Sequence, residues 1–437
     1  MEIFRRKLYE RLVAWKESSH GKTALLIEGP RRVGKSTIAQ QFGKQEYGQY
    51  LFIDFARVGP QTRDLFADTS DLDYIFLQLQ LQFGVQLVER DTLIIFDEVQ
   101  YCPAARQAIK WLVADGRYDY LETGSLISIR KNVADILIPS EERMIQMHPM
   151  DFEEFLWATG DDATFPALRQ LFEARRAGGD AVHRTLMRKF RLYMLVGGMP
   201  QAVLAYLDTN NLAAVDDIKR DILHLYDEDL GKLSDPAQAQ VLFNAIPAQL
   251  AKNVSRFTPA AETDRAVVRE LVNSRTVAVC FHANEPGPGL AASVDLTKFK
   301  LFLADTGLFV TAAFRDRSFT DNDLYRRLLA DKSQANLGYV YENAVAQMLV
   351  AGGHELYYHT MSDAKSKRSY EVDFLISAGE KVIPIEVKSS GYKAHASLDE
   401  FVARHSRHIA RRIVLHTKDF SSEGMVDYLP VYLAPFL

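Results

Sequence analysis

The chain has 437 residues, which at roughly 100–200 residues per domain predicts two to four domains. Hydrophobic residues make up 47% and charged residues 25%, a balance that excludes disordered, collagen-like and low-complexity proteins. Lysine and arginine number 52 against 57 aspartate and glutamate, so the net charge is −5. The chain is therefore no general polycation, and any binding to DNA must be local.

Cysteine usage and hydropathy indicate a location inside the cell. Cys102 and Cys280 lie far apart and have no CxxC or histidine-rich neighbour, which argues against a disulfide framework or a zinc module. The charged residues 1–7 lack the apolar core of a signal peptide, and no stretch reaches the roughly 18 unbroken apolar residues of a membrane span. We therefore expect a cytoplasmic protein without a membrane partner.

Residues 1–150 alternate short apolar runs with helix-length segments, a pattern typical of a parallel sheet wrapped by helices. The predicted strands are 24–28, 51–55, 93–96, 118–121 and 143–147. Their near-continuous apolar runs predict strands that are covered on both faces. The fold class predicted for this part is α/β.

The remaining chain divides into three predicted regions. Residues 151–232 repeat apolar residues at three- and four-residue spacing, which predicts a helical lid or linker. Residues 233–330 read helix, helix, then a strand at 276–281, an order compatible with a winged-helix-like middle domain. Residues 331–437 predict a separate α/β domain with a helix from 338, strands at 370–376, 381–388 and 412–416, and a helix at 398–410.

A phosphate-binding motif follows the first predicted strand and precedes a helical segment. It reads Gly29-Pro30-Arg31-Arg32-Val33-Gly34-Lys35-Ser36-Thr37 and fits G-x-x-x-x-G-K-[ST]. Glycines let the backbone turn its N–H groups inward, and the helix that follows adds its positive dipole end. Lys35 can then reach the β- and γ-phosphates, while the Ser36 hydroxyl can ligate Mg²⁺. All nine residues are thus candidates for binding ATP, with the preference over GTP left open.

Two carboxylates end the predicted strand 93–96. Asp97 at the strand tip can hold the Mg²⁺ shell with Ser36, and Glu98 can polarise the water that attacks the γ-phosphate. Such strand-end acids also occur as helix caps. The next strand leads to Ser125, which is either a polar sensor of the γ-phosphate or an ordinary turn residue.

An ATPase of this type needs an arginine that neutralises charge in the transition state. Arg143 at the start of the fifth strand is the main candidate, and Arg31 and Arg32 are alternatives. An arginine supplied in trans would require a neighbouring subunit, so the sequence leaves open whether the chain forms a homo-oligomer.

The C-terminal region carries alternating charges on two predicted strands. Glu371 and Asp373 share one strand face, and Glu386 and Lys388 share one face of the next strand. The spacing follows the D…E-x-K pattern of metal-dependent nucleases, in which Asp373 and Glu386 would hold Mg²⁺ and Lys388 would orient or activate the attacking water. Glu342, at the edge of an apolar helical stripe, is a further candidate ligand. The alternative is a set of cross-strand ion pairs without catalysis.

The ordered series of motifs resembles a family of prokaryotic AAA-superfamily ATPases. Besides the motifs above, the series comprises residues 95–100, 123–125, 148–155, 193–200, 300–308 and 341–343. The resemblance spans nearly the whole chain and implies an AAA-like core, a winged-helix-like middle and a C-terminal domain of uncharacterised function similar to restriction endonucleases. The chain has Glu142-Arg143 where relatives often have Gly-Arg, and Leu126 where they often have serine.

DNA is a candidate partner of two regions, and for the middle one a purely structural role is favoured. In the C-terminal domain, basic residues before the first strand and around the late helix are clustered enough to meet phosphates: Lys365, Lys367, Arg368, Arg404, Arg407, Arg411 and Arg412. In the middle domain, Arg265 and Arg269 would lie on a recognition helix at 264–273. A solvated helix face, or a winged helix that only packs on the nucleotide domain, explains both without DNA.

We therefore predict a Mg²⁺-dependent ATPase coupled to a nuclease-like C-terminal domain that binds DNA, with cleavage left open. Two alternatives remain: a nucleotide-gated DNA-binding or signalling switch without nuclease chemistry, and a protein-remodelling ATPase.

Overall fold

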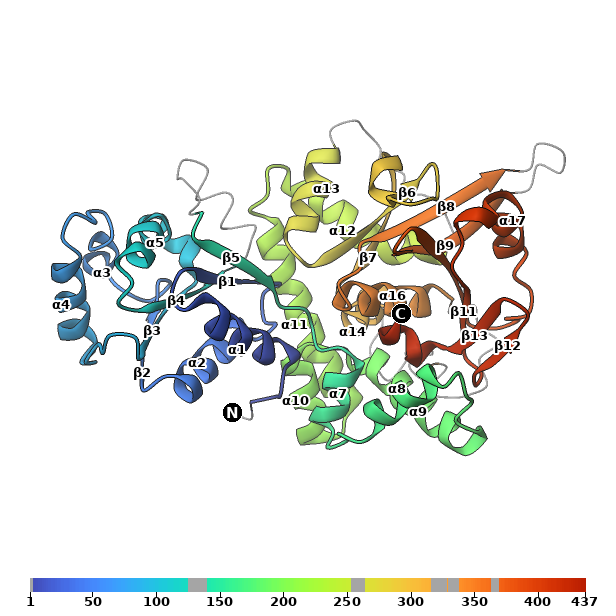
Figure 1. Cartoon of the computed structure of the whole chain (residues 1–437), viewed down its shortest axis with the longest axis horizontal. Coiled ribbons are helices and arrows are strands. Elements are labelled where there is room, and N and C mark those ends of the chain that lie inside the picture. The colour runs from blue at the N-terminus through green and yellow to red at the C-terminus, as the bar shows by residue number, and fades with distance from the viewer. Residues whose placement is uncertain (1–2, 125–139, 253–263, 316–327, 329–337, 363–368) are drawn as a thin grey trace. The chain divides into compact units, whose positions relative to one another are not determined.

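The computed structural model (Figure 1) describes residues 3–124, 140–252, 264–315, 328, 338–362 and 369–437. The chain divides into two units. The first unit comprises Met1–His148 with Asn273–Arg275, and the second comprises Pro149–Val272 with Thr276–Leu437. Within the described ranges, no helix combines the length and the apolar character needed to cross a membrane.

A five-stranded parallel sheet in the order β2-β3-β4-β1-β5 forms the centre of the first unit. Its strands are β1 (Ala24–Glu28), β2 (Gln49–Asp54), β3 (Thr92–Asp97), β4 (Asp119–Gly124) and β5 (Glu142–Gln146). Its helices are α1 (Lys7–Ser19), α2 (Lys35–Glu46), α3 (Pro60–Asp64), α4 (Leu72–Phe83) and α5 (Pro103–Asp115). Each predicted strand overlaps an observed one, so the parallel α/β prediction is confirmed.

Helices cover both faces of this sheet (Figure 1). Leu25 and Ile27 of β1 pack on one face with side chains of α1 and α2. Leu26, which points the opposite way because strand side chains alternate, packs on the other face with α4 and α5. The continuous apolar runs of the sequence follow from this double burial.

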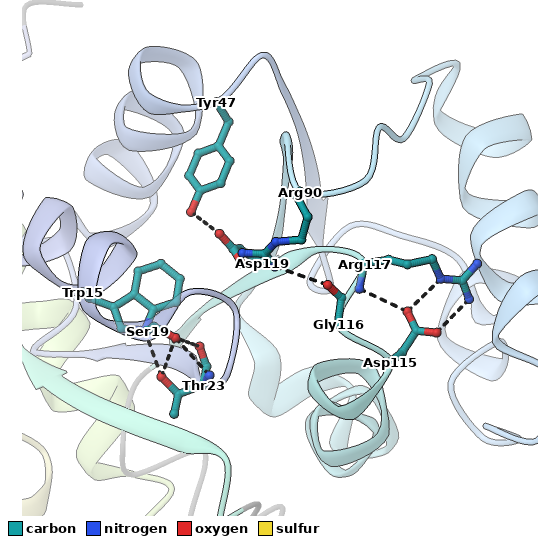
Figure 2. A network of polar contacts seen from close by, with 9 residues as sticks. All are labelled: Trp15, Ser19, Thr23, Tyr47, Arg90, Asp115, Gly116, Arg117 and Asp119. Carbon is teal, nitrogen blue, oxygen red and sulfur yellow. Dashed lines mark hydrogen bonds and ion pairs between the residues drawn. The ribbon is translucent and has the colours of Figure 1, made fainter.

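Polar side chains form hydrogen bonds at the amino ends of strands β1 and β4 (Figure 2). Asp119, the first residue of β4, accepts hydrogen bonds from the Tyr47 hydroxyl at 2.8 Å and from Arg90 at 2.9 Å. Thr23, directly before β1, receives the Trp15 indole N–H at 3.3 Å. In open α/β sheets, ligands bind outside the opposite, carboxyl ends of the strands. The contacts in Figure 2 are accordingly structural.

An eight-stranded mixed sheet in the order β12-β13-β11-β10-β9-β8-β6-β7 forms the centre of the second unit. Its strands are β6 (Val277–Ala283), β7 (Val294–Leu303), β8 (Leu356–Ser362), β9 (Ser369–Ala378), β10 (Lys381–Lys388), β11 (Arg412–His416), β12 (Ser421–Glu423) and β13 (Val426–Pro430). Its helices are α7 (Phe152–Ala158), α8 (Thr164–Glu173), α9 (Asp180–Val196), α10 (Pro200–Thr209), α11 (Leu212–Leu230), α12 (Pro236–Ala251), α13 (Asp264–Asn273), α14 (Thr306–Ala313), α16 (Gly338–Ala351) and α17 (Ala396–His405).

The mixed sheet crosses the domain boundary that we predicted at residue 331. Strands β6 and β7 fall in the predicted middle domain, yet β6 pairs in parallel with β8, with Cys280 opposite Leu356. A parallel pairing of this kind joins segments far apart in the chain and leaves no local sequence pattern. The two strands therefore share one sheet with strands that lie beyond the predicted division between residues 330 and 331.

Candidate functional sites

The phosphate-binding loop lies between β1 and α2 at the carboxyl edge of the parallel sheet. Gly34 has φ 104°, a left-handed conformation that favours glycine, and directly precedes the helix. Lys35 is 6% exposed, and its Nζ donates to the carbonyl oxygens of Gly29 and Pro30, both at 3.0 Å. A Cβ on Gly29 would lie 2.4 Å from the Met147 carbonyl oxygen. The close approach of this backbone explains why glycine begins the loop.

Arg6, before α1, fixes the same loop from outside the motif. Its guanidinium is buried and donates to the Val33 carbonyl at 3.0 Å and to the His148 carbonyl at 2.6 Å. One side chain thus ties the loop to the segment that follows β5. Sequence reasoning missed Arg6, because no local pattern distinguishes it from a surface arginine.

The two nucleotide motifs meet at Asp97, the last residue of β3. Asp97 is 5% exposed and accepts a hydrogen bond from the Thr123 hydroxyl at 2.5 Å. Burial raises the pKa of Asp97, and hydrogen bonds from Thr123 and from Ser36 oppose the rise. A carboxylate and a hydroxyl from separate motifs are therefore adjacent, and hard oxygen ligands of this kind fit Mg²⁺.

Glu98 follows at the strand tip in a left-handed conformation, with φ 53°. Its backbone N–H donates to Thr123 at 3.3 Å, and its half-buried carboxylate accepts a hydrogen bond from Gln100. The structure thus brings Glu98 together with Asp97 beside the loop. Ser125, the predicted sensor, lies outside the described residues.

The candidate arginines occupy less direct positions. Arg143 is exposed on the edge strand β5 and pairs with Leu25 of β1, three residues before the strand end at Glu28. At about 3.3 Å per strand residue, Arg143 stands well back from the carboxyl edge where the loop begins. Arg31 is half-buried and Arg32 is exposed in the loop, as is Thr37 at the start of α2.

Glu142, which stands where relatives often have glycine, has a structural partner. The buried Arg106 of α5 donates to both of its carboxylate oxygens, at 2.9 and 3.2 Å. This bidentate ion pair joins α5 to the edge strand. The departure from the family pattern is therefore accounted for by packing within the first unit.

A row of ionisable side chains extends across the mixed sheet from β7 to β10, on the face covered by α16. Lys300 of β7 contacts Glu342 Oε1 of α16 at 2.9 Å and Glu371 Oε1 of β9 at 2.5 Å. One oxygen each of Glu342, Glu371 and Asp373 lie within 4.8 Å of one another. Three carboxylates at this spacing fit a divalent cation that prefers oxygen ligands.

Burial dominates the electrostatics of this row. It raises the pKa of Asp373 well above the ordinary value, and the charge of Glu342 adds to the rise while Lys300 opposes it. Burial also raises the pKa of Glu342, again opposed by Lys300. For Lys300 itself, burial would lower the pKa, but the carboxylates of Glu342 and Glu371 outweigh it and hold the pKa well above its usual value. The ammonium of Lys300 is thus the central charge of the cluster.

Glu386 and Lys388 form a pair of their own. Lys388 Nζ lies 2.6 Å from Glu386 Oε1, and Asp373 Oδ2 accepts a hydrogen bond from the Val387 backbone N–H at 2.7 Å. The tight carboxylate group therefore contains Glu371 rather than the predicted ligand Glu386. In the sequence, Lys300 was noticed only as part of a family motif. In the structure the ammonium of Lys300, and not that of Lys388, lies between Glu342 and Glu371.

Other family motifs form a buried hydrogen-bonded network in the second unit. Asp305, before α14, accepts from the Gly198 backbone N–H at 2.5 Å. Gln347 of α16 accepts from the Thr306 backbone N–H at 2.8 Å and donates to the Tyr193 hydroxyl at 2.9 Å. These contacts join α9, α14 and α16. Asp305, Gly198 and Tyr193 therefore stabilise the fold, whereas Lys300 and Glu342 of the same motifs belong to the carboxylate row.

The basic residues expected to meet DNA divide into paired and exposed ones. Arg404 is ion-paired with Glu400, and Arg411 with the buried Asp427. Arg265 and Arg269 are both exposed on α13, which spans the predicted recognition helix. Lys365, Lys367 and Arg368 lie outside the described residues.

Comparison with protein families supports the nucleotide site. Residues 21–156 match the family described as an AAA domain. Residues 187–318 and 337–433 match two domains of unknown function, DUF8612 and DUF4143. No curated protein matches the chain. The first unit thus contains a P-loop ATPase domain of the AAA type, whereas the restriction-endonuclease-like fold implied for the C-terminal part is not confirmed.

Three solved structures are similar at low identity. The Walker-type ATPase paby2304 of Pyrococcus abyssi is 15% identical, with 71% of this chain and 96% of that chain covered and a TM-score of 0.41. The Aeropyrum pernix ORC1 protein, solved in complex with DNA, is 12% identical, with 73% and 94% covered and a TM-score of 0.28. The STAND protein PH0952 from Pyrococcus horikoshii, with a tetratricopeptide repeat sensor, is 12% identical, with 80% and 46% covered and a TM-score of 0.27.

Proposed function

We propose that the first unit hydrolyses ATP in a Mg²⁺-dependent reaction, with Lys35, Ser36, Asp97 and Glu98 as its working residues. The observation that carries the proposal is the junction at Asp97, where the Ser36 hydroxyl of the loop and the Thr123 hydroxyl of β4 bond one carboxylate. Ser36 and Asp97 would hold Mg²⁺, which when bound neutralises charge on the phosphate oxygens.

Other residues of the first unit would bind the phosphates, accept the proton and position Asp97. Backbone N–H groups at the start of α2 and the Lys35 ammonium would bind the β- and γ-phosphates. Glu98, beside the metal-holding carboxylate, would accept a proton from the attacking water. Thr123 would position Asp97, since its hydroxyl also receives the Glu98 backbone N–H.

The decisive variant for this proposal is Glu98→Gln. Glutamine keeps the shape and accepts the Gln100 hydrogen bond but cannot take a proton. We expect Mg-ATP affinity close to that of the unmodified protein and turnover reduced about 100-fold or more. The exposed Glu89→Gln is the matched control. Unchanged turnover in Glu98→Gln would remove Glu98 from the mechanism.

For the second unit, we propose a metal-dependent site that acts on the phosphodiester backbone of DNA. Support comes from the three carboxylate oxygens of Glu342, Glu371 and Asp373 within 4.8 Å, with Glu386 and Lys388 on the adjacent strand. The carboxylates would hold Mg²⁺, and Lys388 would orient a water near the scissile phosphate. The exposed arginines of α13 would add phosphate contacts.

Cleavage assays on the full chain separate this proposal from its rivals. With Mg²⁺ or Mn²⁺, we expect the unmodified protein to nick plasmid DNA or cut single strands, and Asp373→Asn to lose that activity while keeping its ATPase. Asp399→Asn, an exposed aspartate of α17, is the control. A chain that leaves every DNA substrate intact but binds DNA in a nucleotide-dependent way is a switch. A chain that neither binds nor cuts DNA points to protein remodelling.

A further inference from the structure

Lys300 is a buried cation placed among acids that would otherwise form a metal site. It stands on β7 between Phe299 and Leu301, and its side chain is 6% exposed. Its Nζ lies 2.9 Å from Glu342 Oε1 and 2.5 Å from Glu371 Oε1. A lysine so deeply buried needs carboxylate partners, and both of its partners are candidate metal ligands.

The ammonium and a divalent cation require the same oxygens. Mg²⁺ and Ca²⁺ sit about 2.0–2.6 Å from their oxygen ligands, so two oxygens on one ion are separated by about 5 Å at most. The oxygens of Glu342, Glu371 and Asp373 satisfy that limit. A cation bound to all three would occupy the region where Lys300 now contacts two of them.

The surroundings offer further acceptors to a cation. Tyr358 of β8 is fully buried, its hydroxyl has no hydrogen-bond partner among the described residues, and Lys300 Nζ lies 5.5 Å from its ring centre. The second oxygen of Glu371, Oε2, is likewise without a partner in the described part of the chain. The Glu371 side chain as a whole is 21% exposed.

We propose that Lys300 is an internal cation that competes with a divalent metal ion for Glu342 and Glu371, so that the metal binds only when the ammonium moves away. This inference rests on the metal site proposed above for the second unit and adds its regulation. Lys300 stands three residues before the end of β7, and Asp305, which bonds the Gly198 backbone, follows that end by two residues. A shift of this segment would therefore move the competing charge.

The test is a calorimetric Mn²⁺ titration of the full chain with two Lys300 variants that act in opposite directions. Lys300→Gln removes the competing charge and is expected to tighten Mn²⁺ binding about tenfold or more. Lys300→Arg keeps the charge on a group that binds carboxylates bidentately and is expected to weaken Mn²⁺ binding. Lys298→Gln, on the same strand and paired with Asp295, is the control with unchanged affinity.

The double variant Asp373→Asn with Lys300→Gln tests whether the ion binds at this cluster. The gain in Mn²⁺ affinity expected for Lys300→Gln should disappear when the Asp373 ligand is lost. If Lys300→Gln is unstable without metal, the Arg variant alone still decides. Equal or tighter Mn²⁺ binding by Lys300→Arg, or no gain in Lys300→Gln, overturns the inference. If the unmodified protein binds Mn²⁺ through Asp373 and neither variant changes the affinity, the metal site stands and the competition is wrong. If no protein in the series binds Mn²⁺, the metal site itself is wrong.

Discussion

The two candidate sites differ in how their charged groups are held. In the first unit, Lys35 and Arg6 donate to backbone carbonyl oxygens of the loop. In the second unit, Lys300 and Lys388 contact carboxylates. A carbonyl oxygen orients a cation without cancelling its charge, whereas a carboxylate cancels it. The loop therefore presents positive charge to an anion, and the carboxylate row is balanced by its own lysines.

The sites also differ in how the chain assembles them. The loop, Asp97 and Thr123 stand at the carboxyl ends of three adjacent parallel strands, so a single sheet edge collects them. The carboxylate row draws one residue from a helix and others from strands of mixed direction, between β7 and β10. The first arrangement depends on local motifs and the second on the whole packing of its unit. Substitutions should therefore separate binding effects from folding effects.

The largest effect is expected from Gly198→Ala in the second unit. An added Cβ would lie 2.0 Å from the Met150 carbonyl oxygen, a contact that requires the backbone to move. We expect a loss of about 3 kcal/mol or more in the free energy of unfolding, measured by urea denaturation. Gly178→Ala is the control, since its Cβ would meet nothing closer than 3.5 Å. Equal stability of the two variants would contradict the structural assignment of this motif.

Lys35→Ala addresses the first unit and should affect binding rather than folding. Removing the ammonium takes away the charge that meets the phosphates, and we expect Mg-ATP affinity to fall about 100-fold, or about 2.7 kcal/mol. Calorimetry measures this directly. Lys44→Ala, an exposed lysine later in α2, should bind as the unmodified protein does. If both variants bind equally, the loop is not the nucleotide site.

The difference between local motifs and partners distant in the chain also determines which parts of the molecule could be predicted from sequence. The bounds of β1 and β10 agree with the predicted strands, because an apolar or alternating pattern involves only consecutive residues. The loop was recognisable for the same reason. Arg6 and Lys300 were not, since each acquires its role from partners distant in the chain, such as Val33 for Arg6 and Glu371 for Lys300.

Motif residues were also easier to locate than to interpret. Asp305 and Tyr193 stand in the motifs that carry the family resemblance, and an acid or a phenol in such a motif is a natural catalytic candidate. The structure instead places both in the buried network that joins α9, α14 and α16. Sequence cannot distinguish a satisfied polar group from a reactive one, because the difference lies in whether a buried partner is present.

The smallest predicted effect concerns Thr123→Val and depends on pH. Burial raises the pKa of Asp97 above the ordinary aspartate value of about 3.9. At pH values between the ordinary and the raised pKa, the folded state therefore binds more protons than the unfolded state. The contribution of Asp97 to stability is therefore greatest at low pH and falls as pH rises through this window. Removing the Thr123 hydroxyl takes away a hydrogen bond that favours the ionised form, so the pKa should rise further.

We accordingly expect Thr123→Val to lose about 1–2 kcal/mol more stability at pH 8 than near pH 4, measured without nucleotide. The lost Glu98 N–H contact adds a loss that is the same at both pH values. Thr92→Val is the matched control: Thr92, the first residue of β3, is as buried as Thr123, and its hydroxyl accepts the neutral Val88 N–H at 2.8 Å. The loss of stability in Thr92→Val should be the same at both pH values. Equal losses at the two pH values in Thr123→Val would mean that the Thr123 hydroxyl does not favour the ionised form of Asp97.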